Sequence, residues 1–212
     1  MNVSLLHRVD HLVYATNDLE ASCAELERRL GVRPSPGGRH LGRGTRNALI
    51  AIGPASYLEI VGPDPEQPAP AAPRWFDIDR LGGPRLVAWA ARTTALQRVI
   101  ADGVRHGVRL GAISSGSRLC ADGVSLSWTF TDPTTVIADG LVPFFIDWGT
   151  SPHPAGSAAG GVELVSFSAE HPDPAHVRKI LEPLGIELQV DAGPHPALIA
   201  TIRTATGLVQ IR

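Results

Sequence analysis

The chain has 212 residues, 43% of them hydrophobic, which is enough for one large domain or two to three small ones with an apolar core. Its 19 basic and 21 acidic side chains leave a formal net charge of −2, so charge does not favour nucleic acid or an anionic membrane as a partner. There is no apolar run of about 18 residues, and the start lacks the order of a signal peptide. We therefore expect a cytoplasmic protein.

The first predicted unit opens with the strand RVDHLVYA at residues 8–15. N-cap candidates follow at residues 16–18, and a helix then runs to Gly31, a residue suited to the left-handed position that closes a helix. After a loop rich in glycine, proline and arginine, two further strands are expected at residues 47–52 and 56–61. This order predicts a unit of one strand, one helix and two further strands.

The second unit repeats the plan. A strand at residues 86–91 is followed by a helix that ends at Gly107. Three further strands are expected near residues 111–115, 125–130 and 141–148.

The third unit is shorter, with a strand at residues 162–169 and a helix that starts at Asp173-Pro174 and closes near Gly185. Its remaining strands are expected at residues 187–190, 197–204 and 208–211.

The glycines that close the three helices, at positions 31, 107 and 185, lie 76 and 78 residues apart, which indicates one structural unit used three times. We predict an α+β fold of repeated βαβββ modules that form an open, curved mixed sheet or barrel around a cleft. The expected boundaries are module one at 1–63, a proline-rich connector at 64–83, module two at 84–149, a linker at 150–160 and module three at 161–212.

Ligand-capable side chains stand on strands of this predicted sheet. His11 lies in the first strand of module one and Glu59 in its last, and side chains of the same facing parity on neighbouring strands can share a metal ion. Asp147 matches Glu59 in module two, because YLEIVG aligns with FIDWG. Val87 or Ala88 stands where His11 would be repeated, and neither can bind a metal.

The loop PSPGGRHLGRGTR at residues 34–46 carries Arg39, His40, Arg43 and Arg46. One interpretation is a mobile lid that binds a substrate carboxylate or phosphate through arginine, and the other is a solvated hairpin tip. The chain has no phosphate-binding loop and no dinucleotide fingerprint.

Four aromatic residues on module-two strands, Trp89, Trp128, Phe145 and Trp148, are candidates to line an apolar pocket for an aromatic or acyl ligand. The alternative is that they belong to the core.

The remaining reactive residue types receive structural interpretations. Cys23 falls on the apolar face of the first long helix and is predicted to be a buried structural thiol, and Cys23 and Cys120 make no disulfide framework. His153 and His171 stand beside prolines and are interpreted as turn residues.

The string VDHLVYATNDLEASCAELERRLGVRPSPGGRH, followed by GTRNALIAIG and SYLEIVGPD, resembles the glyoxalase-like domain proteins of the vicinal oxygen chelate superfamily. The later IDWGTSPHPA and HPDPA are similar to segments of the same group. The resemblance implies paired βαβββ modules that form an open barrel around a metal. It also implies a histidine in the first strand and an acid in the last strand of each module, which here gives His11 and Glu59 as ligands.

The chain departs from this pattern in two places. The second-module histidine is absent, and Arg46 stands where glyoxalase-like relatives often carry histidine, so a guanidinium that cannot coordinate replaces a ligand. His11, Glu59 and Asp147 would leave a metal with three protein ligands and open positions for oxygen donors. The implied cofactor is a divalent ion (Zn, Ni, Mn or Fe), or none.

The first functional hypothesis is a metal-dependent lyase, isomerase or dioxygenase acting on a small oxygenated metabolite. In it His11 and Glu59 are ligands, Asp147 is a third ligand or general base, and Glu59 and Asp147 are the catalytic residues. The alternatives are a metal-free protein that binds or sequesters a small molecule, as bleomycin-resistance relatives do, and a metal-free enzyme with His11 or Glu59 as the base. The odd third module either packs on the first pair or pairs two chains in a homodimer.

Overall fold

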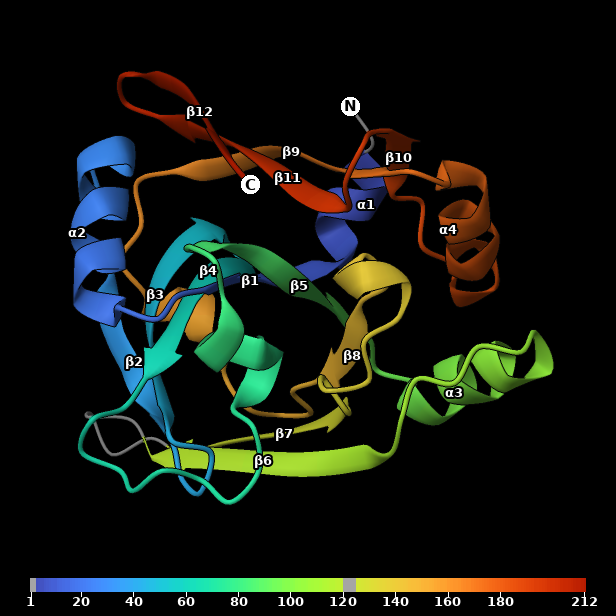
Figure 1. Ribbon diagram of the computed structural model, residues 1–212, viewed down its shortest axis with the longest axis horizontal. Coiled ribbons are helices and arrows are strands. Elements are labelled where there is room, and N and C mark those ends of the chain that lie inside the picture. Colours follow the sequence, from blue (N-terminus) through green and yellow to red (C-terminus); the bar gives the residue numbers. More distant parts are fainter. Residues whose placement is uncertain (1–2, 120–124) are drawn as a thin grey trace.

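The first two predicted units join edge to edge in one curled sheet of eight strands in the computed structural model, which describes residues 3–119 and 125–212 (Figure 1). The strand order is β2-β3-β4-β1-β5-β8-β7-β6. In each unit the first strand pairs in parallel with the last, and the two first strands, β1 and β5, pair antiparallel at the centre of the sheet. The predicted α+β fold class with a curved mixed sheet is confirmed.

The first unit contains β1 (Val9–Ala15), α2 (Leu19–Leu30), β2 (Ser35–His40), β3 (Thr45–Gly53) and β4 (Ser56–Pro63), and the short helix α1 (Val3–Arg8) precedes it. The second contains β5 (Arg85–Arg92), α3 (Leu96–Arg105), β6 (Ile113–Leu119), β7 (Ser125–Thr131) and β8 (Phe144–Asp147). The third contains β9 (Glu163–His171), α4 (Pro174–Leu181), β10 (Gln189–Ala192), β11 (Ala197–Thr204) and β12 (Gly207–Ile211). Short 3₁₀ turns are η1 (Trp75–Arg80), η2 (Ala138–Gly140), η3 (Pro154–Gly156) and η4 (Glu182–Leu184).

The helix ends follow the local chemistry of the sequence. Asp18 caps α2 by accepting a hydrogen bond from a backbone N–H of the first turn, and Asp173 does the same for α4. Gly31, Gly107 and Gly185 follow their helical segments with φ of 72°, 78° and 65°, a region that a residue with a Cβ rarely adopts. The three glycines therefore serve as the helix stops that their spacing predicts.

One strand lies where a loop was expected. Residues 35–40, with the sequence SPGGRH, form β2 and pair antiparallel with β3, so that Ser35 lies opposite Leu49 and His40 opposite Thr45. The segment has low intrinsic preference for a strand, and it is extended because the edge of β3 offers backbone groups to pair with. His40 is therefore on a strand at the sheet edge.

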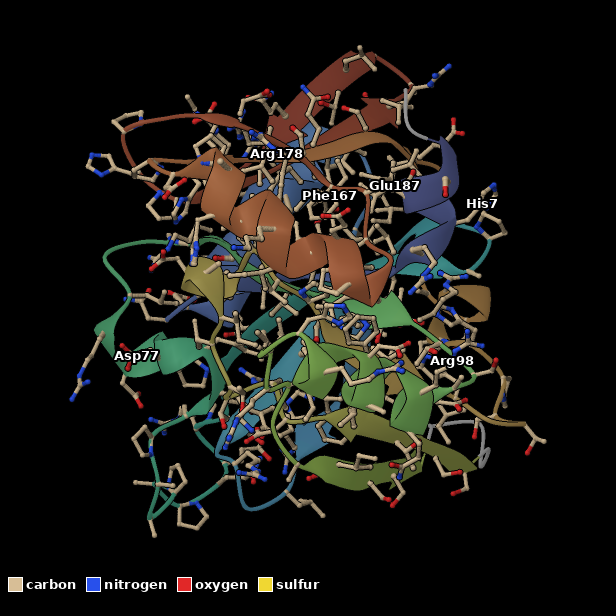
Figure 2. The ribbon with its side chains drawn as sticks, turned by 90° about the vertical axis from the view of Figure 1, so that its right-hand side faces the viewer. His7, Asp77, Arg98, Phe167, Arg178 and Glu187 are labelled. Carbon is tan, nitrogen blue, oxygen red and sulfur yellow. The ribbon has the colours of Figure 1, made fainter. Side chains whose placement is uncertain are left out.

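The third unit packs on the outside of the curled sheet. Its own sheet has the order β10-β9-β11-β12, and its first strand pairs in parallel with the strand after the helix rather than with the last one. Phe167 of β9 meets Trp89 of β5 with ring centroids 5.2 Å apart. Figure 2 shows Phe167 in the interior, whereas His7 and Arg98 lie at the surface. The larger core lies between the two sheets and their helices.

Both connectors fill part of the concave face of the curled sheet. At one end, Ile78 and Leu81 pack on the inward side chains of Val13 and Val61. At the other end, Ala155 and neighbouring connector residues pack on Leu49, Ala51 and Tyr57. Polar side chains on β1 and β4 lie between the two regions that the connectors cover. In the described residues no helix is long and apolar enough to cross a membrane.

Candidate functional site

A cavity of about 950 Å³ opens on the concave face of the curled sheet. Strands of both modules line it, together with the turn after β2, residues of η1 and the start of the connector after β8. None of its lining residues comes from the third unit. The polar lining residues of module one are His11, Arg39, His40, Arg43, Asn47 and Glu59, and those of module two are Ser114, Ser115 and Ser117.

A β-bulge at Asp10 brings two consecutive side chains of β1 together. Val9 pairs with Ala91 of β5 and His11 pairs with Ala90, so Asp10 is an extra residue without a partner across the β1–β5 ladder. A bulge suspends the alternation that would send neighbouring side chains to opposite faces. Asp10 therefore reaches its own neighbour, and its Oδ1 lies 2.8 Å from His11 Nδ1.

Asp10 is a fully buried carboxylate that three donors stabilise. Besides His11, the indole N–H of Trp148 donates to it at 3.1 Å, and Nε2 of His153 lies 3.2 Å from Oδ2. Burial alone would raise the pKa of Asp10, but the hydrogen bonds from His11 and His153 outweigh this effect and hold the pKa well below the usual value. Asp10 is therefore ionised and accepts only, so His11 Nδ1 carries the proton of their hydrogen bond.

Glu59 faces the same cavity from β4. In the parallel pairing of β1 with β4, His11 lies beside Tyr57, and their rings stack with centroids 4.6 Å apart. Glu59 follows Tyr57 by two residues on the same face, and its Oε2 lies 3.7 Å from His11 Nε2. His11 is 4% exposed and Glu59 is 8% exposed, so both act in a largely dehydrated setting.

Asn47 holds the other oxygen of Glu59, and His40 lies near it. Asn47 donates from Nδ2 to Glu59 Oε1 at 2.6 Å, and its own Oδ1 accepts from the backbone N–H of Gly38, which fixes the orientation of the amide. His40 Nε2 lies 3.7 Å from the same Oε1, and His40 Nδ1 lies 2.9 Å from the hydroxyl of Thr45. The carboxylate thus lies between two imidazoles.

Aromatic side chains form the module-two wall of the cavity. Trp128 and Trp148 both line it, with ring centroids 5.2 Å apart. Gly116 lies directly opposite Trp128 in the β6–β7 pair, and the indole lies across it. The absence of a side chain at Gly116 therefore gives the Trp128 ring its place in the wall.

We expect Gly116→Ala to lower the free energy of unfolding by about 1–3 kcal/mol, because the added Cβ would lie 2.5 Å from two ring atoms of Trp128. Gly82→Ala is the matched control, since nothing lies within 4 Å of a Cβ added there. Urea unfolding curves of both variants measure the difference. Equal stability of the two variants would contradict the packing described for Trp128.

Other predicted site residues lie away from the cavity. Trp89 and Phe145 are fully buried in the main core, where the indole N–H of Trp89 donates to the carbonyl of Leu141. Arg46 pairs with Glu20 on α2 and does not line the cavity.

Asp147 also lies outside the cavity lining, because Phe144 and Ile146 are the residues of β8 that face it. Its Oδ1 accepts from the backbone N–H of Gly149, so it stabilises the turn after the strand.

Arg39 lines the cavity and is paired with Asp64 and Glu66, whereas Arg43 stacks on Trp75 with its guanidinium carbon 4.9 Å from the ring centroid. Cys23 is partly buried against the main core, and burial raises the pKa of its thiol to about 11. Cys120 lies outside the described residues.

Comparison with known proteins identifies a family for this chain. A family model described as a glyoxalase-like domain matches residues 9–185. The chain belongs to the glyoxalase-like domain family. The resemblance to glyoxalase-like domain proteins is thereby confirmed. No curated protein matches the chain.

Among solved structures, a hypothetical protein from Staphylococcus aureus aligns with a TM-score of 0.63 at 11% identity, over 96% of this chain and 85% of that one, and shows the same fold. Methylmalonyl-CoA epimerase from Mycobacterium tuberculosis aligns with a TM-score of 0.44 at 18% identity, over 70% and 93% of the two chains. The Streptomyces coelicolor epimerase aligns with a TM-score of 0.44 at 22% identity, over 66% and 95%.

The metal centre that the resemblance implies has a poor fit to this glyoxalase-like protein. His11 and Glu59 come together, but Asp147 is turned away at the end of β8. His40 approaches Glu59 from its other oxygen, and Asn47 already occupies that oxygen with a hydrogen bond. Within residues 3–119 and 125–212 there is no group of three His, Cys, Asp or Glu placed to hold a metal ion. The donor set expected from the sequence is therefore incomplete.

Three residues of the site in this glyoxalase-like protein were not anticipated: Asp10, Asn47 and His153. A signal for Asp10 does exist, because the adjacent polar pair Asp10-His11 breaks the alternation of a strand with buried neighbours on both sides. Asn47 reaches the site through the pairing of β3 with β4, and His153 reaches it because the chain reverses after β8. A single sequence carries no pattern that indicates either arrangement.

Proposed function

We propose that this glyoxalase-like protein is an enzyme that moves a proton on a small carbonyl-containing substrate, with His11 as the general base. The observation that carries the proposal is the hydrogen bond of His11 Nδ1 to the buried carboxylate of Asp10. With Nδ1 protonated, a neutral imidazole has its lone pair on Nε2, which faces the cavity near Glu59. A base with this orientation can accept a proton from a bound molecule.

The reaction step needs no external oxidant or reductant. A C–H bond next to the carbonyl breaks, its electron pair moves toward the carbonyl oxygen as an enolate, and the proton forms an N–H bond at His11 Nε2. Delivery of a solvent-derived proton to the same carbon gives exchange, and delivery of a proton to the other face of the carbon or to the oxygen gives isomerisation. The imidazolium formed on the way lies between Asp10 and Glu59, whose negative charges stabilise it in a largely dehydrated site.

An imidazole and a guanidinium on the module-one side are placed to interact with the developing negative charge of the substrate. His40 lies near Glu59, and Arg43 lies at the turn that follows β2, stacked on Trp75. The apolar and aromatic wall of module two supplies surface for the rest of the molecule and excludes water. The proposed substrate is accordingly a small oxygenated compound with an apolar portion.

The proposal is tested by solvent deuterium exchange, followed by ¹H NMR, into pyruvate, hydroxyacetone and dihydroxyacetone. We expect the wild-type protein to accelerate exchange into at least one probe, and treatment with EDTA to leave that rate within about twofold, since the proposed base needs only its own protein partners. Acceleration of none of the probes would overturn the proposal. Loss of exchange on EDTA treatment, with recovery on adding a divalent ion, would overturn it in favour of the metal-dependent hypothesis.

A metal-free binding protein is the second candidate, and the lining of module two favours it. That module contributes three serines and the side chains of Trp128, Phe130, Phe144 and Ile146 to the cavity, without a charged group among them. The dye anilinonaphthalene sulfonate is a suitable probe of such a surface. Dye binding that Trp128→Leu weakens, in a protein that exchanges no probe, would support this candidate over the enzyme.

A further inference from the structure

The connector after β8 folds back over module one and closes one end of the concave face. Ala159 accepts a hydrogen bond from the backbone N–H of Ala51 at 2.7 Å, and its own N–H donates to the hydroxyl of Ser35 at 3.1 Å. Ala155 is buried against the inward face of β3 and β4. Residues 148–159 are thus anchored to the same strands that carry the site.

Within this connector, the backbone determines the tautomer of His153. The N–H of Ala155 donates to His153 Nδ1 at 3.2 Å, so this nitrogen accepts and carries no proton. A neutral His153 then has its proton on Nε2, which lies 3.2 Å from Asp10 Oδ2. His153 is therefore oriented as a donor to the buried carboxylate.

Trp148 adds a second donor from the same segment. Its indole N–H lies 3.1 Å from Asp10 Oδ2 and 3.3 Å from Oδ1, and its ring packs edge-on against His153. The two connector residues thus satisfy the side of the carboxylate that His11 does not use. The buried Asp10 can then remain an acceptor toward His11 Nδ1.

We propose that His153 and Trp148 are positioning residues that act through Asp10 to keep His11 in the tautomer with its proton on Nδ1. Each hydrogen bond in the chain has a defined direction: Ala155 N–H to His153, His153 to Asp10, and His11 to Asp10. The result is a bare Nε2 of His11 toward the cavity. Residues 148–159 thereby determine whether His11 can take up a proton, an inference that rests on the proposed role of His11 as base.

Without the donors Trp148 and His153, the directions of these hydrogen bonds are no longer fixed. With both connector donors removed, His11 is the one donor left of the three, and nothing else fixes the rotation of the Asp10 carboxylate. The hydrogen bond from His11 Nδ1 then loses its set geometry, and His11 is free to carry its proton on Nε2, where it blocks proton uptake. The tautomer of His11 is accordingly the quantity that separates a positioning role from a purely structural one.

The test measures this tautomer in two-bond ¹H–¹⁵N spectra of protein containing ¹⁵N-labelled histidine, with His11 assigned by comparison with His11→Gln. We expect the Nδ1–H form in the wild type and a substantial Nε2–H population in His153→Ala. Glutamine can still donate to Asp10, so His153→Gln is expected to restore the wild-type pattern. His176→Ala on the exposed face of α4 is the matched control.

The kinetic readout uses the most active exchange probe. We expect His153→Ala to lower kcat about tenfold with KM changed less than twofold, which is typical of removing a partner that orients an active group. Trp148→Phe, which removes only the N–H donor, serves if His153→Ala does not fold. His11 remaining in the Nδ1–H form in every folded variant would overturn the inference. Failure of the proposed function looks different, because the tautomer shifts would then occur in a protein that exchanges no probe.

Discussion

His11→Gln is expected to lower the rate of solvent deuterium exchange by about 10²–10⁴-fold, the contribution that a positioned general base makes to a proton transfer. Glutamine keeps an N–H that can donate toward Asp10, so the cavity keeps its shape, but an amide takes up no proton near neutral pH. The expected loss is in kcat, since the substrate surface on module two is unchanged. Exchange into the active probe, followed by ¹H NMR on EDTA-treated protein, measures it.

The controls separate His11 from its neighbours. His176→Gln makes the same chemical change on the surface of α4, outside the cavity, and should leave exchange unaffected. Glu59→Gln, measured alongside, tests the other candidate base. A His11→Gln protein that keeps more than about a tenth of the wild-type rate, while Glu59→Gln loses nearly all of it, would transfer the base role to Glu59.

The helix ends and the repeated plan could be predicted because they depend on local chemistry. A capping aspartate such as Asp18 and a glycine such as Gly31 act within one turn of the chain, and their residue types are restricted by backbone geometry. His11 and Glu59 could be paired for a similar reason, since they lie on the first and last strands of one short unit. The metal itself was inferred from resemblance. Of its three expected ligands, only His11 and Glu59 lie close together.

The facing of the module-two strand β8 could not be predicted, because its apolar run is buried on both sides. Phe144 and Ile146 face the cavity while Phe145 lies in the main core, and an all-apolar strand has no alternation that distinguishes these two sets. Asp147 shares the facing of Phe145 and therefore misses the cavity. Aligning it with Glu59 by sequence matched the motif but not the side-chain direction.

The contacts of Asp10 with the connector depend on long-range folding. Asp10 and His153 are far apart in sequence and meet because the chain reverses after β8 and pairs with the edge of β3. The bulge that turns Asp10 toward His11 is itself a feature of register between β1 and β5, two strands of different modules. The interpretation of His153 as a turn residue missed its side chain, and the backbone of His153 is extended at the N-cap of η3.

Asp10→Asn is expected to lower the free energy of unfolding by about 3 kcal/mol near neutral pH, because three buried donors then meet a neutral amide. The amide oxygen can accept from part of this set, but its NH₂ group faces donors that need an acceptor. Asp18→Asn is the matched control, since asparagine caps a helix as well as aspartate does. Urea unfolding of both variants measures the cost, and equal stability would contradict the charged role of Asp10.

The same variant gives a pH dependence of defined sign. Because the pKa of Asp10 is lowered in the folded protein from its usual value of 3.8, its ionised form stabilises the fold above about pH 4, and this contribution is lost as the pH falls toward the folded pKa. The difference between wild type and Asp10→Asn should therefore shrink as the pH is lowered from about 7 to about 3. A difference that stays constant over this range would mean that the lost stability comes from packing rather than from the charge that orients His11.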